Sequence, residues 1–149
     1  MSKQAENNSS LKEIFYQELT TGQKALFVFR VYYDHAIESE SEFYWWSSYY
    51  LAQPKIWSSI KVGVKHFRDQ SMYLLLEEIE AILRKYNCPA TLDKFSITRE
   101  DLERNIELFT SIKPLYSRFN QDAPVTIKNI CQFIRTNSEE FLSLDYGSA

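Results

Sequence analysis

Apolar residues recur at intervals of three and four positions through most of the chain, which is the spacing of amphipathic helices. This spacing predicts helices over residues 11–19, 22–38, 43–52 and 54–67, and a fifth that ends near residue 86. The fifth helix has the longest apolar stripe, which consists of Met72, Leu75, Leu76, Ile79, Ile82, Leu83 and Tyr86.

Polar residues with capping chemistry mark where these helices begin. Ser10 and Glu13 have the spacing of a capping box, and Asp69 or Ser71 can cap the fifth helix. The polar stretch 38–42 is predicted to be a loop that ends in a serine cap. Pro54 is expected to separate the third and fourth helices, because the residue before a proline avoids the helical conformation.

The second half of the chain contains three prolines and continues the helical pattern. Thr98 is expected to open a sixth helix with a stripe from Leu102 to Phe119, which Pro114 should kink or split. Pro124 and Thr126 are predicted to start a seventh helix, and Ser138 to cap a last short turn. The segment 90–97 is the one weak strand candidate, and a single strand does not make a sheet.

These elements predict an all-α fold, a single compact domain of about six to eight helices. The chain has only three glycines and four prolines among 149 residues, too few for the many tight turns of a β-sandwich or barrel. The expected boundaries are a disordered lead-in at 1–9, the helical domain at 10–145 and a tail at 146–149.

The charge and the apolar segments exclude several classes of partner. A net charge of −3 leaves no basic surplus for general nucleic-acid binding. No stretch approaches the roughly 18 apolar residues of a membrane span, so no membrane association is expected. The first ten residues lack the apolar core of a signal peptide. The sequence therefore predicts a cytoplasmic protein.

No familiar catalytic or metal-binding motif is present. His35 and His66 do not follow a glutamate at the Glu-x-x-His spacing of di-iron helices. Cys88 and Cys131 are far apart; two buried free thiols are favoured, and one disulfide stays open. We therefore predict no catalytic residues, no metal and no cofactor. A site assembled from distant helices would leave no sequence motif, so an enzyme remains an alternative hypothesis.

The aromatic segment 43–50 is the most distinctive stretch of the chain. It contains Phe43, Tyr44, Trp45, Trp46, Tyr49 and Tyr50, which would surround a helix on all sides. A helix that is apolar all round is either buried between layers or offers one face to a partner. Tyrosine and tryptophan combine an apolar body with a polar tip, which suits interfaces. Both interpretations, core and recognition surface, remain open from the sequence.

Short motifs at both ends resemble a family of small all-helical bacterial proteins of mostly unknown function, a family that includes a DNA mimic. The motifs are Leu19 to Phe27 with its Gly-Gln pair, the aromatics Phe43 to Trp46, and a distal set: Leu115, Tyr116, Phe119, Ile130, Phe133, Ile134, Arg135, Asn137 and Phe141. The family carries an Asn-Gly-Gly turn before the aromatic helix, where this chain has Ser-Glu-Ser-Glu. The resemblance implies the fold and a non-enzymatic partner-binding role. DNA mimicry is not carried over, because a net charge of −3 is small for competing with a polyanion.

The leading functional hypothesis is a non-enzymatic protein-interaction or regulatory domain. Its contact surface would be the aromatic helix and the acidic loop before it, with a protein partner or a second copy, as in a homodimer. The anchors would be Trp45, Trp46, Tyr49 and Tyr50, with Glu40 and Glu42 at the rim steering a basic partner. The alternative is a small-molecule-binding domain with an aromatic-lined pocket that touches Tyr32 or Tyr33 and Trp57.

Overall fold

A computed structural model describes the backbone of residues 23–147 and the side chains of residues 23–136. Over that part of the chain there are six α-helices and no strand, which confirms the predicted all-α class. They are a first helix, described over residues 23–36, then α2 (Glu40–Leu51), α3 (Pro54–His66), α4 (Gln70–Lys85), α5 (Asp101–Arg104) and α6 (Ile106–Gly147). The predicted lead-in at 1–9 and helix at 11–19 lie outside the described residues.

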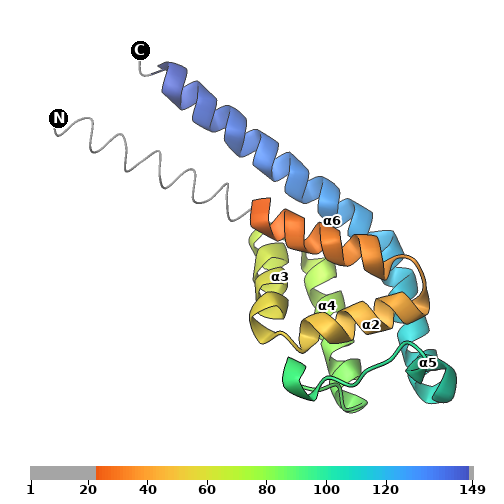
Figure 1. Cartoon of the computed structure of the whole chain (residues 1–149). Coiled ribbons are helices and arrows are strands. Elements are labelled where there is room, and N and C mark those ends of the chain that lie inside the picture. Colours follow the sequence, from red (N-terminus) through yellow and green to blue (C-terminus); the bar gives the residue numbers. More distant parts are fainter. Residues whose placement is uncertain (1–22, 148–149) are drawn as a thin grey trace.

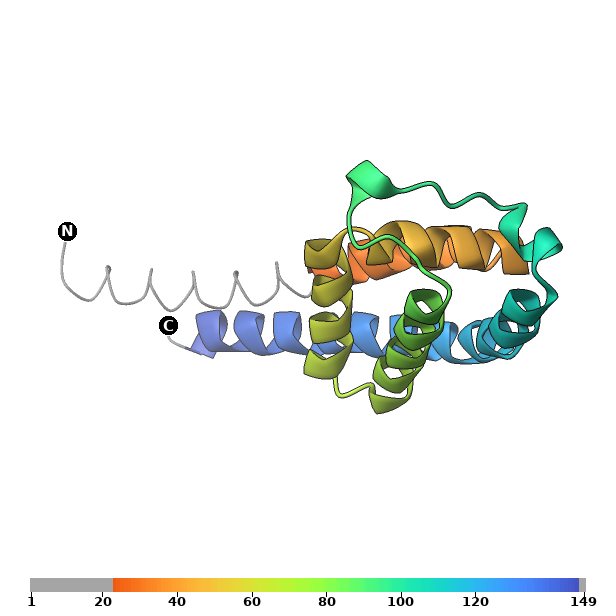
Figure 2. The ribbon, with the colours of Figure 1, turned by 90° about the horizontal axis from the view of Figure 1, so that it is seen from below.

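Helix α6 is the longest of the described helices. It packs against α2, α4 and α5, while α3 packs against both α2 and α4 (Figure 1). The first helix joins α6 through side chains: the Tyr116 hydroxyl donates to the Ile37 carbonyl at 2.5 Å. Seen from below, α6 runs the length of the molecule and continues past the other helices (Figure 2).

Aromatic rings fill the centre of the core. The ring of Phe119, on α6, contacts Tyr32 and Phe43 with centroid distances of 5.2 Å in both cases. Tyr32 also contacts the rings of Tyr50 and Trp57 edge to face. The rest of the core comes from the predicted helical stripes, including the buried residues Ile60, Val64, Met72, Leu75, Leu76, Ile79, Leu83, Leu102 and Ile112. The apolar periodicity therefore identified most of the residues that the fold buries.

One predicted helix start agrees with the structure and another does not. The Asp69 side chain accepts a hydrogen bond from the Met72 amide at 3.0 Å, so Asp69 caps α4 as predicted. Helix α2, in contrast, begins at Glu40 because the Ser39 hydroxyl accepts from the Glu42 amide at 3.1 Å. The predicted loop at 38–42 was therefore wrong over its last three residues. Glu40 and Glu42 lie in the first turn of α2, where the helix dipole favours negative charge.

The strand candidate at 90–97 is not a strand. The segment contains a single 3-10 turn, Leu92–Lys94, within the connection between α4 and α5. No neighbouring described segment pairs with it, and an unpaired strand is not stable by itself.

The predicted start of a separate seventh helix at Pro124 was wrong, and at Pro114, where a kink or a split was expected, the helix is not split. The chain breaks at Asn105, whose backbone is extended and whose side chain caps α6 by accepting from the Leu108 amide at 3.2 Å. Helix α6 then continues through both Pro114 and Pro124 to Gly147. Both prolines are exposed, so their rings face solvent, and the helix bends as it passes around the core (Figures 1 and 2).

Candidate interaction surface

The aromatic segment of α2 divides between the core and the surface. Phe43, Tyr44 and Tyr50 are buried, and Tyr50 is 8% exposed with its ring against Tyr32. Trp45 and Trp46 are only half-buried, as is Tyr49. The core interpretation therefore holds for the three buried residues. The recognition interpretation stays open for the other three, which are partly exposed and are three of the four predicted aromatic anchors.

Trp45 attaches the connection 86–100 to α2. Its indole Nε1 donates to the Ile97 carbonyl at 3.2 Å, and its ring stacks on Tyr49 with a centroid distance of 5.0 Å. Phe95, from the same connection, places its ring edge-on to both Trp45 and Tyr49. We call the four half-buried rings of Trp45, Trp46, Tyr49 and Phe95 the aromatic ledge.

A charged pair holds the ledge at its end nearest the start of α2. The Arg99 guanidinium lies over the Trp45 ring, 4.5 Å from its centroid, and forms a two-pronged ion pair with Glu42, with Nη2 to Oε2 at 3.2 Å. The Trp46 Nε1 also donates to Glu42 at 3.0 Å. The Arg99 hydrogen bonds, and then that of Trp46, lower the pKa of the Glu42 carboxyl despite its partial burial.

The other predicted acidic residue, Glu40, lies near further acidic side chains. Glu40 is half-buried in the first turn of α2, and Glu38, Glu100 and Glu103 are exposed close to that end of the helix. Beside them a surface hollow of about 390 Å³ is lined by Ser41, Leu102, Glu103, Ile106 and Phe109. Ile106 is 79% exposed, so the hollow has an apolar wall next to an acidic rim.

Trp46 connects the ledge to the first helix. Its ring stacks face to face on His35, with centroids 4.1 Å apart and planes 13° apart. His66, the other histidine, contacts the rings of Phe67 and Phe133. Both imidazoles therefore pack against aromatic rings, which is a structural role for each of them.

The residues named for an aromatic-lined pocket pack directly against one another. Tyr32 is fully buried and Trp57 is 2% exposed, and their ring centroids are 6.3 Å apart. Protein atoms thus fill the space between the two rings. A shallow hollow of about 340 Å³ does lie beside Trp57, lined by charged residues of α3 and α4.

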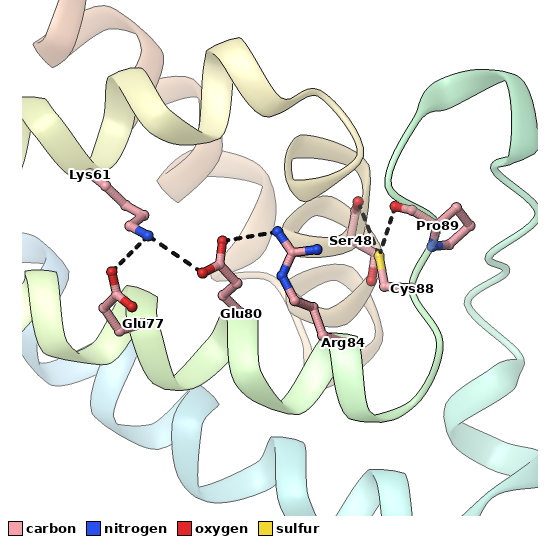
Figure 3. Close-up of polar contacts among 7 residues, drawn as sticks. All are labelled: Ser48, Lys61, Glu77, Glu80, Arg84, Cys88 and Pro89. Atoms are coloured by element: carbon pink, nitrogen blue, oxygen red, sulfur yellow. Dashed lines mark hydrogen bonds and ion pairs between the residues drawn. The ribbon is translucent and has the colours of Figure 1, made fainter.

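Ion pairs occupy that hollow. The Lys61 ammonium lies between Glu77, at 2.7 Å, and Glu80, at 3.4 Å, and Arg84 pairs with Glu80 (Figure 3). The pKa of Lys61 is raised by its hydrogen bonds with Glu77 and Glu80, which outweigh the opposing effect of its partial burial. These pairs join α3 to α4 and neutralise most of the hollow's charge.

Both cysteines are free thiols and both are half-buried. The Cys88 Sγ donates to the Ser48 and Pro89 carbonyls (Figure 3), and burial raises the pKa of the thiol. A raised pKa reduces the thiolate fraction, so Cys88 is less reactive than an ordinary cysteine. Among residues 23–136, no three His, Cys, Asp or Glu side chains lie close enough to hold a metal ion.

No family model, curated protein or solved structure matches the chain. The family resemblance carried by residues 19–27 and the aromatic helix therefore stays a prediction. Within the described part of the chain, no helix is both long and apolar enough to cross a membrane.

Proposed function

We propose that the protein is a non-enzymatic interaction domain that binds a basic segment of a partner protein. The aromatic ledge supplies the apolar contact, and the acidic side chains around the start of α2 supply the charge. The observation that carries the proposal is that Trp45, Trp46 and Tyr49 are only partly buried, while the indole nitrogens of both tryptophans are already hydrogen-bonded within the domain.

The rigidity of the ledge favours binding. Each ring already packs against a neighbour: Trp45 on Tyr49, and Trp46 on His35. Side chains fixed before binding lose little conformational entropy when a partner covers them. Large aromatic side chains of this type carry much of the energy of protein interfaces.

The charges favour a basic partner. Glu40 lies in the first turn of α2 two residues after Glu38, Glu103 lines the hollow that contains Ile106, and Glu100 follows Arg99 in the chain. Arg99 is neutralised by Glu42, so it does not oppose the field of these carboxylates. A segment with lysine or arginine beside an apolar side chain fits both features, and the charges would mainly increase its rate of association.

The small-molecule alternative has weaker support. It rested on a cavity at Tyr32 or Tyr33 and Trp57, and Tyr32 and Trp57 are in ring contact in the core. An enzyme would need a nucleophile or base at a cleft with a group that orients it. His35 packs on the Trp46 ring, and His66, which lines a groove beside α3, has no carboxylate among the described lining residues of that groove. The interaction domain therefore accounts for more of the observed surface.

The test compares partner capture by the wild type with capture by charge variants, followed by binding measurements on the purified partner. The variant Glu40→Lys/Glu103→Lys reverses two rim charges and should weaken binding at least tenfold. The control Asp34→Lys/Glu78→Lys makes the same change in net charge at two exposed residues elsewhere, Asp34 on the first helix and Glu78 on α4. Cross-links between the purified partner and the wild type should map to the ledge.

Equal loss of binding in both variants would show a non-specific charge effect. Unchanged binding in Glu40→Lys/Glu103→Lys, with cross-links elsewhere, would contradict the proposed surface.

A further inference from the structure

An apolar groove lies at the opposite end of the first helix from the ledge. It runs between residues 23–28 and the second half of α3, has a volume of about 730 Å³, and includes Phe27, Val28, Val62, Gly63 and Phe67 in its lining. Phe27 is 70% exposed and Val62 is 63% exposed. Both residues line the groove, and exposed apolar surface of this kind is typical of docking sites.

Gly63 shapes the groove by allowing the two helices to approach closely. A methyl group placed on Gly63 would lie 3.0 Å from the Cβ of Ala25, which is tighter than ordinary carbon contacts. The floor is therefore formed by helices in direct contact, and the exposed Phe27 and Val62 form part of its walls.

Helix α6 leaves the domain next to this groove. Phe133 contacts the rings of His66 and Phe67. Beyond Phe133 the backbone stays helical to Gly147, a further 14 residues or about 21 Å, and extends past the other described helices in both views (Figures 1 and 2). A projecting helix of this length is marginal by itself in water, so it needs a packing partner.

The projecting end of α6 cannot fill the groove of its own chain. It continues as one helix away from the domain, and to fold back it would have to break (Figure 1). In a second copy, however, the same groove is available. We propose that the C-terminal end of α6, residues 137–147, docks in the apolar groove of a second copy of this chain, and that the contact is reciprocal in a two-fold dimer.

The sequence of this end suits the groove in both polarity and charge. Residues 137–147 include three large apolar residues, Phe141, Leu142 and Leu144, and three acidic residues, Glu139, Glu140 and Asp145. Lys24 and His66 are among the residues that line the groove, and Arg68 is exposed directly after Phe67, another lining residue. Acidic side chains on the docking helix would meet basic ones at the rim.

This dimer goes beyond the proposed function and does not depend on it, because the ledge and the groove share no residue. A dimer would carry two ledges, which would let it bind two basic segments of one partner with increased avidity.

Light scattering coupled to gel filtration tests the dimer. The wild type should have the mass of two 17.7 kDa chains. Val62→Glu places a charge in the groove at an exposed position and should give a folded monomer, and so should a chain that ends at Thr136. Val125→Glu is the matched control: Val125 is 55% exposed on α6 and does not line the groove, so this variant should remain a dimer.

A second measurement identifies the docking contact. In a chain without its two native cysteines, Val62→Cys and Leu142→Cys placed on separate chains should form a disulfide between copies after mixing. A dimer that persists in both Val62→Glu and the shortened chain would overturn the proposal. A monomeric wild type would also overturn it if an apolar dye reached the groove only after residues 1–19 were removed. The occupant of the groove would then be the chain's own N-terminal segment.

Failure of this proposal is separable from failure of the proposed function. Glu40→Lys/Glu103→Lys should leave the mass of the assembly unchanged, and Val62→Glu should leave the ledge of each monomer able to bind the partner with its single-site affinity.

Discussion

Glu42 is the residue at which the ledge, helix α2 and the connection 86–100 meet. It accepts hydrogen bonds from Arg99 and from Trp46, and so links two elements that are 57 positions apart in the chain. The ion pair is partly shielded from solvent, because only 22% of the Glu42 side chain is exposed. Its role in the structure is therefore to hold the connection in place rather than to remain free for a partner.

The lowered pKa of Glu42 makes part of the stability depend on pH. The pKa of this carboxyl is lower in the folded state than in the unfolded chain, chiefly because of the Arg99 hydrogen bonds. A group with a depressed folded-state pKa contributes stability above the unfolded-state pKa, and that contribution is lost as the pH falls through the folded-state value. The stabilising effect is thus present at neutral pH and disappears in acid.

We expect Glu42→Gln to be less stable than the wild type at neutral pH, with the difference shrinking as the pH falls through the glutamate range. Urea unfolding of both proteins at several pH values measures this difference. Asp34→Asn is the control, because Asp34 forms an ordinary exposed i,i+4 pair with Arg30. A difference that is constant with pH would show that the Glu42 charge is not involved.

Helix ends determine how the elements connect. Helices α3 and α4 are each followed by a residue with positive φ, Arg68 at 59° and Asn87 at 65°. The next amides then bond back to the helix: Asp69 to the Val64 carbonyl at 3.0 Å and Cys88 to the Leu83 carbonyl at 2.9 Å. This C-terminal motif favours glycine, tolerates asparagine and strains most other residues, because their Cβ lies too close to the following carbonyl oxygen.

We therefore predict that Arg68→Gly raises the free energy of unfolding by up to about 1 kcal/mol, because it removes the steric cost of the left-handed conformation. Asn87→Gly should give a smaller gain, and Arg68→Ala, which keeps a Cβ, should give none. Urea unfolding of the three variants measures these effects. Equal gains in the free energy of unfolding for Arg68→Gly and Arg68→Ala would instead show that the effect comes from loss of the charged side chain.

The elements that were predictable from the sequence are those with a local signal. The stripe of α4 and its Asp69 cap follow from the residues themselves. The start of α2 was not predictable, because Ser39 and Ser41 can both cap a helix and the local sequence does not distinguish them. The unbroken helix at Pro124 was not predicted, because an exposed proline can be accommodated by a bend that depends on the core against which α6 packs. The break at Asn105 was not predicted either, because the apolar stripe from Leu102 to Phe119 runs through that position.

The candidate site was predictable only in part for the same reason. The sequence identified Trp45, Trp46 and Tyr49, but residue spacing could not show that Tyr50 faces the core. Phe95 and Arg99 were not predicted at all, because their contacts with α2 arise from the path of the connection 86–100. Neither residue belongs to a motif, so no sequence signal would have found them.

The whole molecule has two surfaces of different character at different ends of the first helix. The ledge is aromatic with an acidic rim, and the groove is apolar with basic residues at its edge. The ledge is fixed by contacts within one chain, whereas the groove and the projecting end of α6 complement one another between chains. The two proposals, binding a partner and forming a dimer, therefore concern separate parts of the molecule.

The central claim is that Trp45 and Trp46 offer an accessible surface that a partner covers. The chain has three tryptophans, of which only Trp57, at 2% exposed, is core. Acrylamide quenching of fluorescence compares Trp57→Phe, which keeps the two ledge tryptophans, with Trp45→Phe/Trp46→Phe, which keeps only Trp57. We predict strong quenching in the first variant, reduced when the partner binds, and weak quenching in the second. Ledge tryptophans that are as protected as Trp57 in the free protein would contradict the account.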